Sequence, residues 1–192
     1  TDFLDYLSDF RYPLSGEFAT FVSQAKLLRY PSDWGIEVGL LSEIYRIVRV
    51  SQVCQVELTE RYDHKHQEVG TETDKGLNKM ATDIARTFFS HLSSNGVILT
   101  RDMLSTIRLT YLRHARESVG IYESYAKIYS NAISFDFHEE LKTVESFARI
   151  IETASIDFYQ HIYGSPMIPA WKRVRAAIDG ISEKLIMAVD TY

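Results

Sequence analysis

The densest group of polar side chains in the sequence lies between residues 57 and 66. It comprises Glu57, Glu60, Arg61, Tyr62, Asp63, His64, Lys65 and His66. If this segment is extended, His64 and His66 lie on one face, because side chains alternate along a strand. Two imidazoles on one face can bind a metal ion or a phosphate. His-x-His is also common in solvated loops and edge strands, so a mixed-charge surface remains the alternative. We expect Cys54, just upstream, to be a small buried side chain.

A second polar candidate is the segment Trp34-Gly35-Ile36-Glu37-Val38-Gly39-Leu40-Leu41. In one interpretation, Glu37 accepts hydrogen bonds from a sugar or acceptor hydroxyl, Gly35 permits close backbone approach and Trp34 offers an apolar platform. In the other, Glu37 is only a carboxylate that meets the positive end of a helix dipole. The segment Ser15-Gly16-Glu17 allows the same two interpretations, and there a turn with a helix cap is favoured.

Other chemical signatures are missing or have a structural explanation. The sequence has no Gly-x-Gly-x-x-Gly, Walker loop, Gly-x-Ser-x-Gly, His-Glu-x-x-His or cysteine pair, which argues against a standard NTPase, hydrolase or zincin. It also lacks the Asp-x-Asp that holds a divalent ion in many nucleotide-sugar enzymes. The acidic run that starts at Asp136 opens a long apolar pattern, so we interpret it as a helix N-terminus.

The secondary structure predicted for the segments that position these residues changes near Gly70, from short mixed elements to long helices. Before it, the spacing of apolar residues predicts a short helix that ends at Tyr12-Pro13, a helix over about 17–28 and another over about 36–48. Asp33 or Ser32 is a plausible cap for the third helix. The β-rich run from Val50 to Leu58 predicts one strand.

After residue 70 the pattern is almost purely helical. We expect helices over 77–92, over 101–116 with a possible continuation at 120–130, and over 137–163. Gly96 is expected to supply a left-handed cap for the first of these. A last helix begins after Pro169 and repeats its apolar residues at near-heptad spacing, which suits packing against a partner helix or another subunit.

The composition and charge of the chain argue against further classes of function. The 192 residues carry 21 Lys and Arg against 26 Asp and Glu, and no basic block, so we expect no nucleic-acid surface. No apolar run approaches the roughly 18 residues of a membrane span, and no export signal is visible. One cysteine is compatible with a reducing cytoplasm, which is the predicted location. The absence of an initiator Met suggests a chain that begins inside a longer protein or was trimmed.

Three segments together resemble a known family. Pro13-Leu14-Ser15-Gly16-Glu17-Phe18-Ala19, the Trp34 to Leu41 segment, and Gln55-Val56-Glu57-Leu58 followed by Tyr62-Asp63-His64-Lys65-His66-Gln67 match in order and spacing the second half of glucosyl-3-phosphoglycerate and mannosyl-3-phosphoglycerate synthases. The segment Ile168-Pro169-Ala170-Trp171 is a looser part of the same resemblance. These families are retaining glycosyltransferases of the GT-A fold.

The resemblance implies an α/β fold overall, the GT-A nucleotide-diphospho-sugar transferase fold, of which this chain is the C-terminal half, mostly α-helical with a few short strands. Residues 1–70 are then the C-terminal part of the catalytic core, and residues 71–192 a helical extension that forms a homodimer contact. The implied reaction transfers glucose from a nucleotide-diphosphate sugar to the 2-hydroxyl of 3-phosphoglycerate, with Mg²⁺ or Mn²⁺ neutralising the leaving diphosphate.

The resemblance also implies roles for single residues. His64 is the best match to the histidine that joins the Asp-x-Asp on the metal, and His66 is the second choice. Arg61 would face the diphosphate, Glu37 the transferred sugar or acceptor as the catalytic carboxylate, and Lys65 or His66 the acceptor phosphate. Trp34 and Gly35 belong to the donor side of the same site.

The nucleotide-binding half of such enzymes is not in these 192 residues. We therefore expect the isolated chain to have little or no catalytic activity. A different hypothesis is a non-catalytic helical binding or assembly module that retains the polar motifs, and a third is a mononuclear His-x-His metal protein, for which further ligands with convincing spacing are lacking.

Overall fold

The computed structural model describes residues 2–58, 76–129, 134–161 and 166–189. The chain forms two compact units, one made of residues 1–60 and 165–192 and the other of residues 61–164. The predicted boundary at residue 70 lies outside the described residues and stays a prediction. The C-terminal residues group with the first sixty residues rather than with the helices that precede them, because they pair with a strand near residue 30.

Helix α3 (Ile36–Ile47) is the central element of the first unit, and its bounds confirm the predicted helix over 36–48. Helix α1 (Asp2–Ser8) packs against it and confirms the predicted first helix. Phe3 and Tyr6 of α1 are buried and place their rings 5.3 and 5.0 Å from the ring of Tyr45. An aromatic cluster of this kind contributes burial of a large apolar area at the α1–α3 contact.

The helix expected over residues 17–28 is much shorter than predicted. Only Val22–Ala25 is helical (α2), and Phe18, Phe21 and Val22 are largely exposed. An amphipathic pattern forms a long helix when its apolar face finds a surface to pack against. Among residues 17–28 only Leu28 is buried, so the rest of the pattern has no such surface among the described residues.

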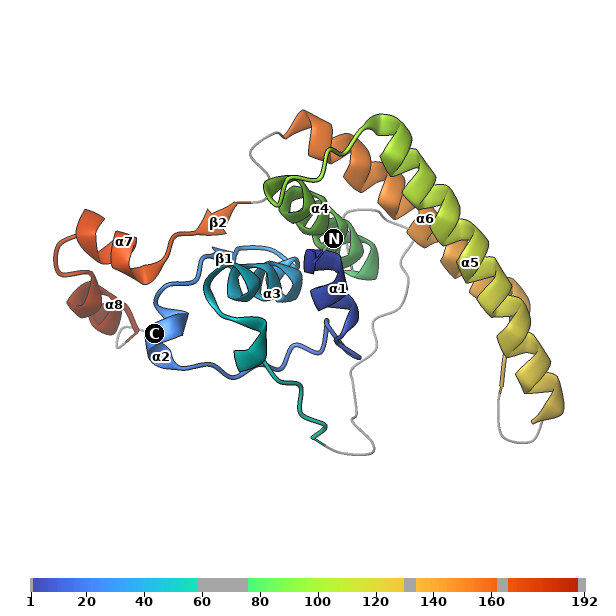
Figure 1. Ribbon diagram of the computed structural model, residues 1–192, viewed down its shortest axis with the longest axis horizontal. Coiled ribbons are helices and arrows are strands. Elements are labelled where there is room, and N and C mark those ends of the chain that lie inside the picture. The colour runs from blue at the N-terminus through green and yellow to red at the C-terminus, as the bar shows by residue number, and fades with distance from the viewer. Residues whose placement is uncertain (1, 59–75, 130–133, 162–165, 190–192) are drawn as a thin grey trace. The chain divides into compact units, whose positions relative to one another are not determined.

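A two-stranded antiparallel sheet joins the two segments of the chain that make up the first unit, residues 1–60 and 165–192. Strand β1 (Tyr30–Pro31) pairs with β2 (Met167–Ile168), with Tyr30 opposite Ile168 and Pro31 opposite Met167. The Ser32 backbone N–H and hydroxyl both donate to the carbonyl of Pro166, at 3.2 and 3.1 Å. These bonds hold the 166–170 segment beside the chain that leads into α3 (Figure 1).

The strand predicted over Val50 to Leu58 is wrong for the described structure. Val50–Gln52 forms a short 3₁₀ helix (η1), and residues 53–58 have no regular secondary structure. A β-rich sequence becomes a strand only when a second strand supplies the inter-strand hydrogen bonds. The described residues supply none to this segment.

The last predicted helix is divided in two. Helix α7 (Trp171–Ala177) ends at Ile178, whose backbone is extended, and α8 (Ile181–Val189) begins after Gly180, whose φ of +65° lies in the left-handed region that favours glycine. The near-heptad spacing is therefore not carried by one continuous helix. No residue of either helix is fully buried.

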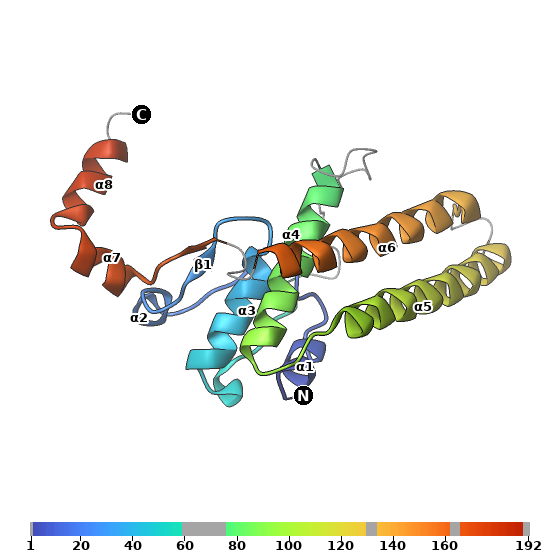
Figure 2. The same cartoon turned by 90° about the horizontal axis from the view of Figure 1, so that it is seen from above.

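The second unit consists of helices α4 (Gly76–Ser94), α5 (Arg101–Ile128) and α6 (Phe137–Gln160). Helix α6 packs against both other helices, and α5 and α6 run side by side in opposite directions (Figure 1, Figure 2). Their shared core is made of Phe89, Leu92, Leu104, Val119, Val144, Ala148, Ile150 and Ala154. Helix α5 is continuous through Gly120, where the sequence suggested an interruption.

Local capping signals in the second unit are confirmed. Gly96 has a φ of +84° and ends the turn after α4, where the Val97 N–H reaches back to the Leu92 carbonyl at 3.1 Å. Asp136 caps α6, since its carboxylate accepts hydrogen bonds from the N–H groups of His138 and Glu139. The acidic run there is a helix N-terminus, as expected.

The predicted class of mostly α-helical structure with a few short strands is confirmed for the described residues. Within those residues, a helix with the length and apolar content of a membrane span is not found.

Candidate functional site

The start of α3 holds three of the predicted site residues. Gly35 is buried and is the N-cap residue of the helix, while Trp34 before it remains 47% exposed. The Asp33 carboxylate accepts the Gly35 N–H at 2.9 Å, which closes a turn before the helix. The expected cap is thus corrected: neither Ser32 nor Asp33 caps the first turn, and Ser32 bonds instead to Pro166.

Glu37 lies in the first turn of α3 and is half-buried. Its carboxylate approaches the Ser15-Gly16-Glu17 turn, because a Cβ built on Gly16 would lie 3.9 Å from Glu37 Oε1. Gly16 has a φ of +73°, which explains why this turn contains glycine. A carboxylate at a helix N-terminus, beside a backbone without a side chain and near an exposed indole ring, can accept hydrogen bonds from a hydroxyl ligand.

Arg11, which lies just before the Pro13 to Ala19 segment, contacts the segment that contains Gln55 and Glu57. Its backbone N–H donates to the side-chain oxygen of Gln55 at 2.8 Å, and its guanidinium forms an ion pair with Glu57. Arg11 directly precedes the Tyr12-Pro13 turn, so the segments around residues 12–17, 34–41 and 55–57 meet in one unit. Sequence reasoning missed Arg11, because a pair of residues 46 positions apart leaves no local signal.

The remaining predicted site residues lie outside the described residues. These are Arg61, His64, Lys65 and His66, which were assigned to the diphosphate, the metal and the acceptor phosphate. In residues 2–58, 76–129, 134–161 and 166–189, no group of three or more His, Cys, Asp or Glu side chains is arranged to hold a metal ion. The Mg²⁺ or Mn²⁺ assignment and the choice between His64 and His66 therefore stay predictions.

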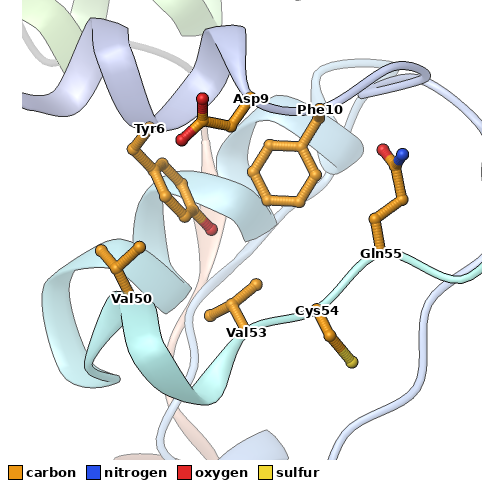
Figure 3. Close-up of a pocket in the computed structure, with 7 residues that line it drawn as sticks. All are labelled: Tyr6, Asp9, Phe10, Val50, Val53, Cys54 and Gln55. Carbon is orange, nitrogen blue, oxygen red and sulfur yellow. The ribbon is translucent and has the colours of Figure 1, made fainter.

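Cys54 is exposed, which corrects the expectation of a buried side chain. It borders a small open hollow of about 130 Å³, lined by Tyr6, Asp9, Phe10, Val50, Val53, Cys54 and Gln55 (Figure 3). The Tyr6 hydroxyl points toward the space between Phe10 and Val53 and has no hydrogen-bond partner among the described residues. Burial raises the pKa of Tyr6 to about 12. None of the predicted site residues lines this hollow.

Helix α3 also carries a buried carboxylate, that of Glu43. Glu43 is 1% exposed and accepts hydrogen bonds from the guanidinium groups of Arg29, at 2.5 Å, and Arg46, at 2.9 Å. The Arg29 backbone N–H adds a third bond at 3.2 Å. Burial raises the pKa of Glu43, but these hydrogen bonds outweigh it and lower the pKa from 4.5 to about 2. Sequence analysis missed this group, whose only local signal is the Glu43 to Arg46 spacing on α3.

Comparison with known proteins gives two matches that cover nearly the whole chain. The chain is 41% identical over 188 residues to a glucosyl-3-phosphoglycerate synthase of Persephonella marina, and 38% identical over 188 residues to one of Methanococcoides burtonii. The alignments include 98% and 97% of this chain and 46% of each synthase. No family model and no solved structure matches the chain.

Both relatives are named glucosyl-3-phosphoglycerate synthases. The resemblance to glucosyl-3-phosphoglycerate synthases is confirmed, and the chain is homologous to part of such a synthase. It spans about half the length of the curated relatives it matches.

Proposed function

We propose that this chain is the C-terminal half of a glucosyl-3-phosphoglycerate synthase with the GT-A fold, in which residues 1–70 complete the catalytic core. The whole enzyme transfers glucose with retention from a nucleotide-diphosphate sugar, UDP- or GDP-glucose, to the 2-hydroxyl of 3-phosphoglycerate, in a cytoplasmic route to glucosylglycerate-type products. The observation that carries the proposal is the approach of Glu37 to the Ser15-Gly16-Glu17 turn, together with the two synthase relatives.

In this proposal, Glu37 is the carboxylate that accepts hydrogen bonds from the transferred sugar or the acceptor. Its position supports the role, because it lies in the first turn of α3 and Gly16 places no side chain beside the carboxylate. Trp34 contributes an exposed ring on which a sugar face can stack, and the turn at Gly35 lets a ligand approach the backbone.

The charged groups of the proposal are Arg61 at the diphosphate, His64 as the metal ligand, and Lys65 or His66 at the acceptor phosphate. Mg²⁺ or Mn²⁺, when bound, would supply charge neutralisation at the departing diphosphate. An imidazole nitrogen and carboxylate oxygens form a donor set that Mn²⁺ accepts, and the cationic side chains suit phosphate oxygens. The Asp-x-Asp that completes such a metal site would come from the half of the synthase outside this chain.

The proposal predicts the kinetics of substitutions in the longer protein of which this chain would be a part. With UDP-glucose, 3-phosphoglycerate and Mg²⁺, His64→Ala should lower metal-dependent product formation about tenfold or more, and Glu37→Gln should do the same. The 192-residue chain alone should form little or no product. The matched control is His138→Ala, an exposed histidine at the start of α6 that should leave activity unchanged.

Each outcome of this assay has a defined meaning. Full activity in His64→Ala with loss in His66→Ala would move the metal ligand to His66. Full activity in Glu37→Gln would remove that carboxylate from the reaction. A longer protein that is folded but inactive toward both UDP- and GDP-glucose would favour the non-catalytic assembly module.

We also propose that the helical region forms a homodimer. The observation that supports it is an apolar stripe on the second half of α5 and its C-cap residue, where Ile121, Tyr122, Tyr125, Ile128 and Tyr129 are each 50–70% exposed. Positions 121, 125 and 128 follow the helical spacing of one face, so the stripe is continuous. Contiguous exposed apolar surface of this kind is typical of protein–protein contacts.

The dimer is tested by changing the stripe without changing the helix core. Ile121→Glu with Ile128→Glu should weaken self-association about 100-fold in sedimentation velocity, since two charges would enter an apolar contact. Helicity should be unchanged, because both side chains point away from the buried residues of α5. Leu109→Glu, equally exposed on the first half of α5, is the control and should still dimerise. A wild-type chain that sediments as a monomer at high concentration would contradict the proposal.

A further inference from the structure

The turn that precedes α3 is bonded to a segment from the end of the chain. Strand β2 pairs with β1, and beyond this pair Ser32 donates two hydrogen bonds to the Pro166 carbonyl, from its backbone N–H at 3.2 Å and from its hydroxyl at 3.1 Å. The two partners are 134 positions apart in the sequence. Their contact fixes the backbone two residues before Trp34, which is a candidate site residue.

The register of the pair explains why β1 tolerates a proline. Hydrogen-bonded and non-hydrogen-bonded positions alternate along an antiparallel pair. Since Ser32 donates to Pro166, the neighbouring pair of Pro31 and Met167 is a non-hydrogen-bonded one, where a missing N–H costs no bond. Pro31 is buried, and its ring packs so closely on α3 that a Cβ on Gly39 would lie 2.2 Å from Pro31 Cγ. Strand β1 is therefore held both by the C-terminal segment 166–170 and by α3.

Trp34 lies between two residues whose backbones are held by hydrogen bonds. Ser32 before it is bonded to Pro166, and the Gly35 N–H after it donates to the Asp33 carboxylate at 2.9 Å. The Trp34 side chain itself is 47% exposed. Because about half of this side chain has no protein packed around it, its direction depends on the backbone of the turn. A change in the bonds of Ser32 should therefore alter the freedom of the indole ring.

We propose that Ser32 is a positioning residue, which uses the Pro166 carbonyl as an anchor to orient the Trp34 ring for the donor sugar. The C-terminal segment 166–170 then contributes to substrate recognition without touching the substrate. This inference rests on the proposed function for the role of Trp34 at the donor sugar. The anchoring itself rests on the hydrogen bonds of Ser32 alone.

The anchoring is tested in the 192-residue chain through the fluorescence of Trp34. The chain has two tryptophans, so Trp171→Phe leaves Trp34 as the single reporter. In that background, Ser32→Ala should raise the rate constant of acrylamide quenching about twofold and lower the anisotropy that persists on the nanosecond timescale, because the indole ring moves more freely. Ser32→Thr keeps a hydroxyl and should restore both values.

The matched control removes a serine hydroxyl elsewhere. Ser124 of α5 donates its hydroxyl to the Gly120 carbonyl at 2.9 Å, and it is exposed like Ser32. Ser124→Ala therefore loses the same type of bond, and it should change neither the quenching nor the anisotropy of Trp34.

The effect on recognition is tested in the longer protein of which this chain would be a part. With UDP-glucose or GDP-glucose as the varied substrate, Ser32→Ala should raise KM about fivefold, the factor expected for one hydrogen bond, and should leave kcat nearly unchanged. The KM for 3-phosphoglycerate should stay the same, since Trp34 is assigned to the donor side. Ser32→Thr should restore the KM for the donor.

The two measurements separate failure of the anchoring from failure of the proposed function. Unchanged quenching and anisotropy in Ser32→Ala would overturn the anchoring, whatever the kinetics. A freer Trp34 ring with an unchanged KM for the donor would overturn the role in recognition, and equal increases in KM for both substrates would show a general structural role instead. A longer protein that is inactive with both nucleotide sugars would contradict the proposed function and with it the role in recognition, while the fluorescence still decides the anchoring.

Discussion

Glu43→Gln is expected to lower the free energy of unfolding by about 3 kcal/mol at neutral pH. The carboxylate is buried and bonded to two arginines, and the neutral amide cannot replace both charge-assisted hydrogen bonds. Arg29 and Arg46 are about half exposed, so water can solvate them after the change and limit the loss. Urea denaturation of the wild type and the variant measures the difference.

The pH dependence of stability provides a separate test of the same group. The folded-state pKa of Glu43 is about 2, below its ordinary value of 4.5, so the unfolded chain binds the proton more readily. The stabilisation is therefore complete above about pH 4.5 and is lost as the pH falls through the folded pKa near 2. The wild-type curve should fall more steeply than that of Glu43→Gln in this window.

A half-exposed ion pair is the matched control for Glu43. Glu145 and Arg116 approach within 3.1 Å, but both side chains are about 50% exposed. Because water screens such a pair, Glu145→Gln should change the free energy of unfolding by less than about 1 kcal/mol. Equal losses in the two variants would contradict the assignment of Glu43 as a buried structural charge.

Gly39→Ala should have an effect of similar size, although it adds only one methyl group. A Cβ on Gly39 would lie 2.2 Å from Pro31 Cγ and 2.9 Å from Pro31 Cδ, closer than van der Waals contact allows. The proline ring belongs to β1 and cannot rotate away, so α3 and β1 must separate. We expect a loss of about 2–3 kcal/mol in unfolding free energy, measured by urea denaturation.

The control for this substitution is Gly120→Ala in the middle of α5. A Cβ there would have nothing within 4 Å, so only helix propensity changes. The variant should be more stable than the wild type by about 0.5–1 kcal/mol. If Gly39→Ala were as stable as Gly120→Ala, the close packing of α3 on β1 would be wrong.

Gly39 also connects the fold to the candidate site. It lies two residues after Glu37 on α3, and its contact with Pro31 sets how closely the helix approaches the β1–β2 pair. A shift of α3 would move Glu37 relative to Gly16. The variant is therefore expected to affect both the stability of the first unit and the geometry around the proposed catalytic carboxylate.

The sequence by itself determined the long helices and approximately where each begins. Helices α3, α4, α5 and α6 follow from the spacing of apolar residues, and the caps at Gly96 and Asp136 follow from single residue types. These features are predictable because helix hydrogen bonds and caps join residues only a few positions apart. The motifs that indicated the synthase family were also readable, since they are short segments in a defined order.

Tertiary structure decided the features that depend on distant residues. The strand expected over Val50 to Leu58 is absent because no described segment pairs with it, and the Arg11–Glu57 contact joins residues 46 positions apart. Burial of Glu43 and the pairing of β1 with β2, 136 positions away, likewise leave no local pattern. Strand pairing, ion pairing and burial of charge depend on which surfaces meet, and local propensity does not specify this.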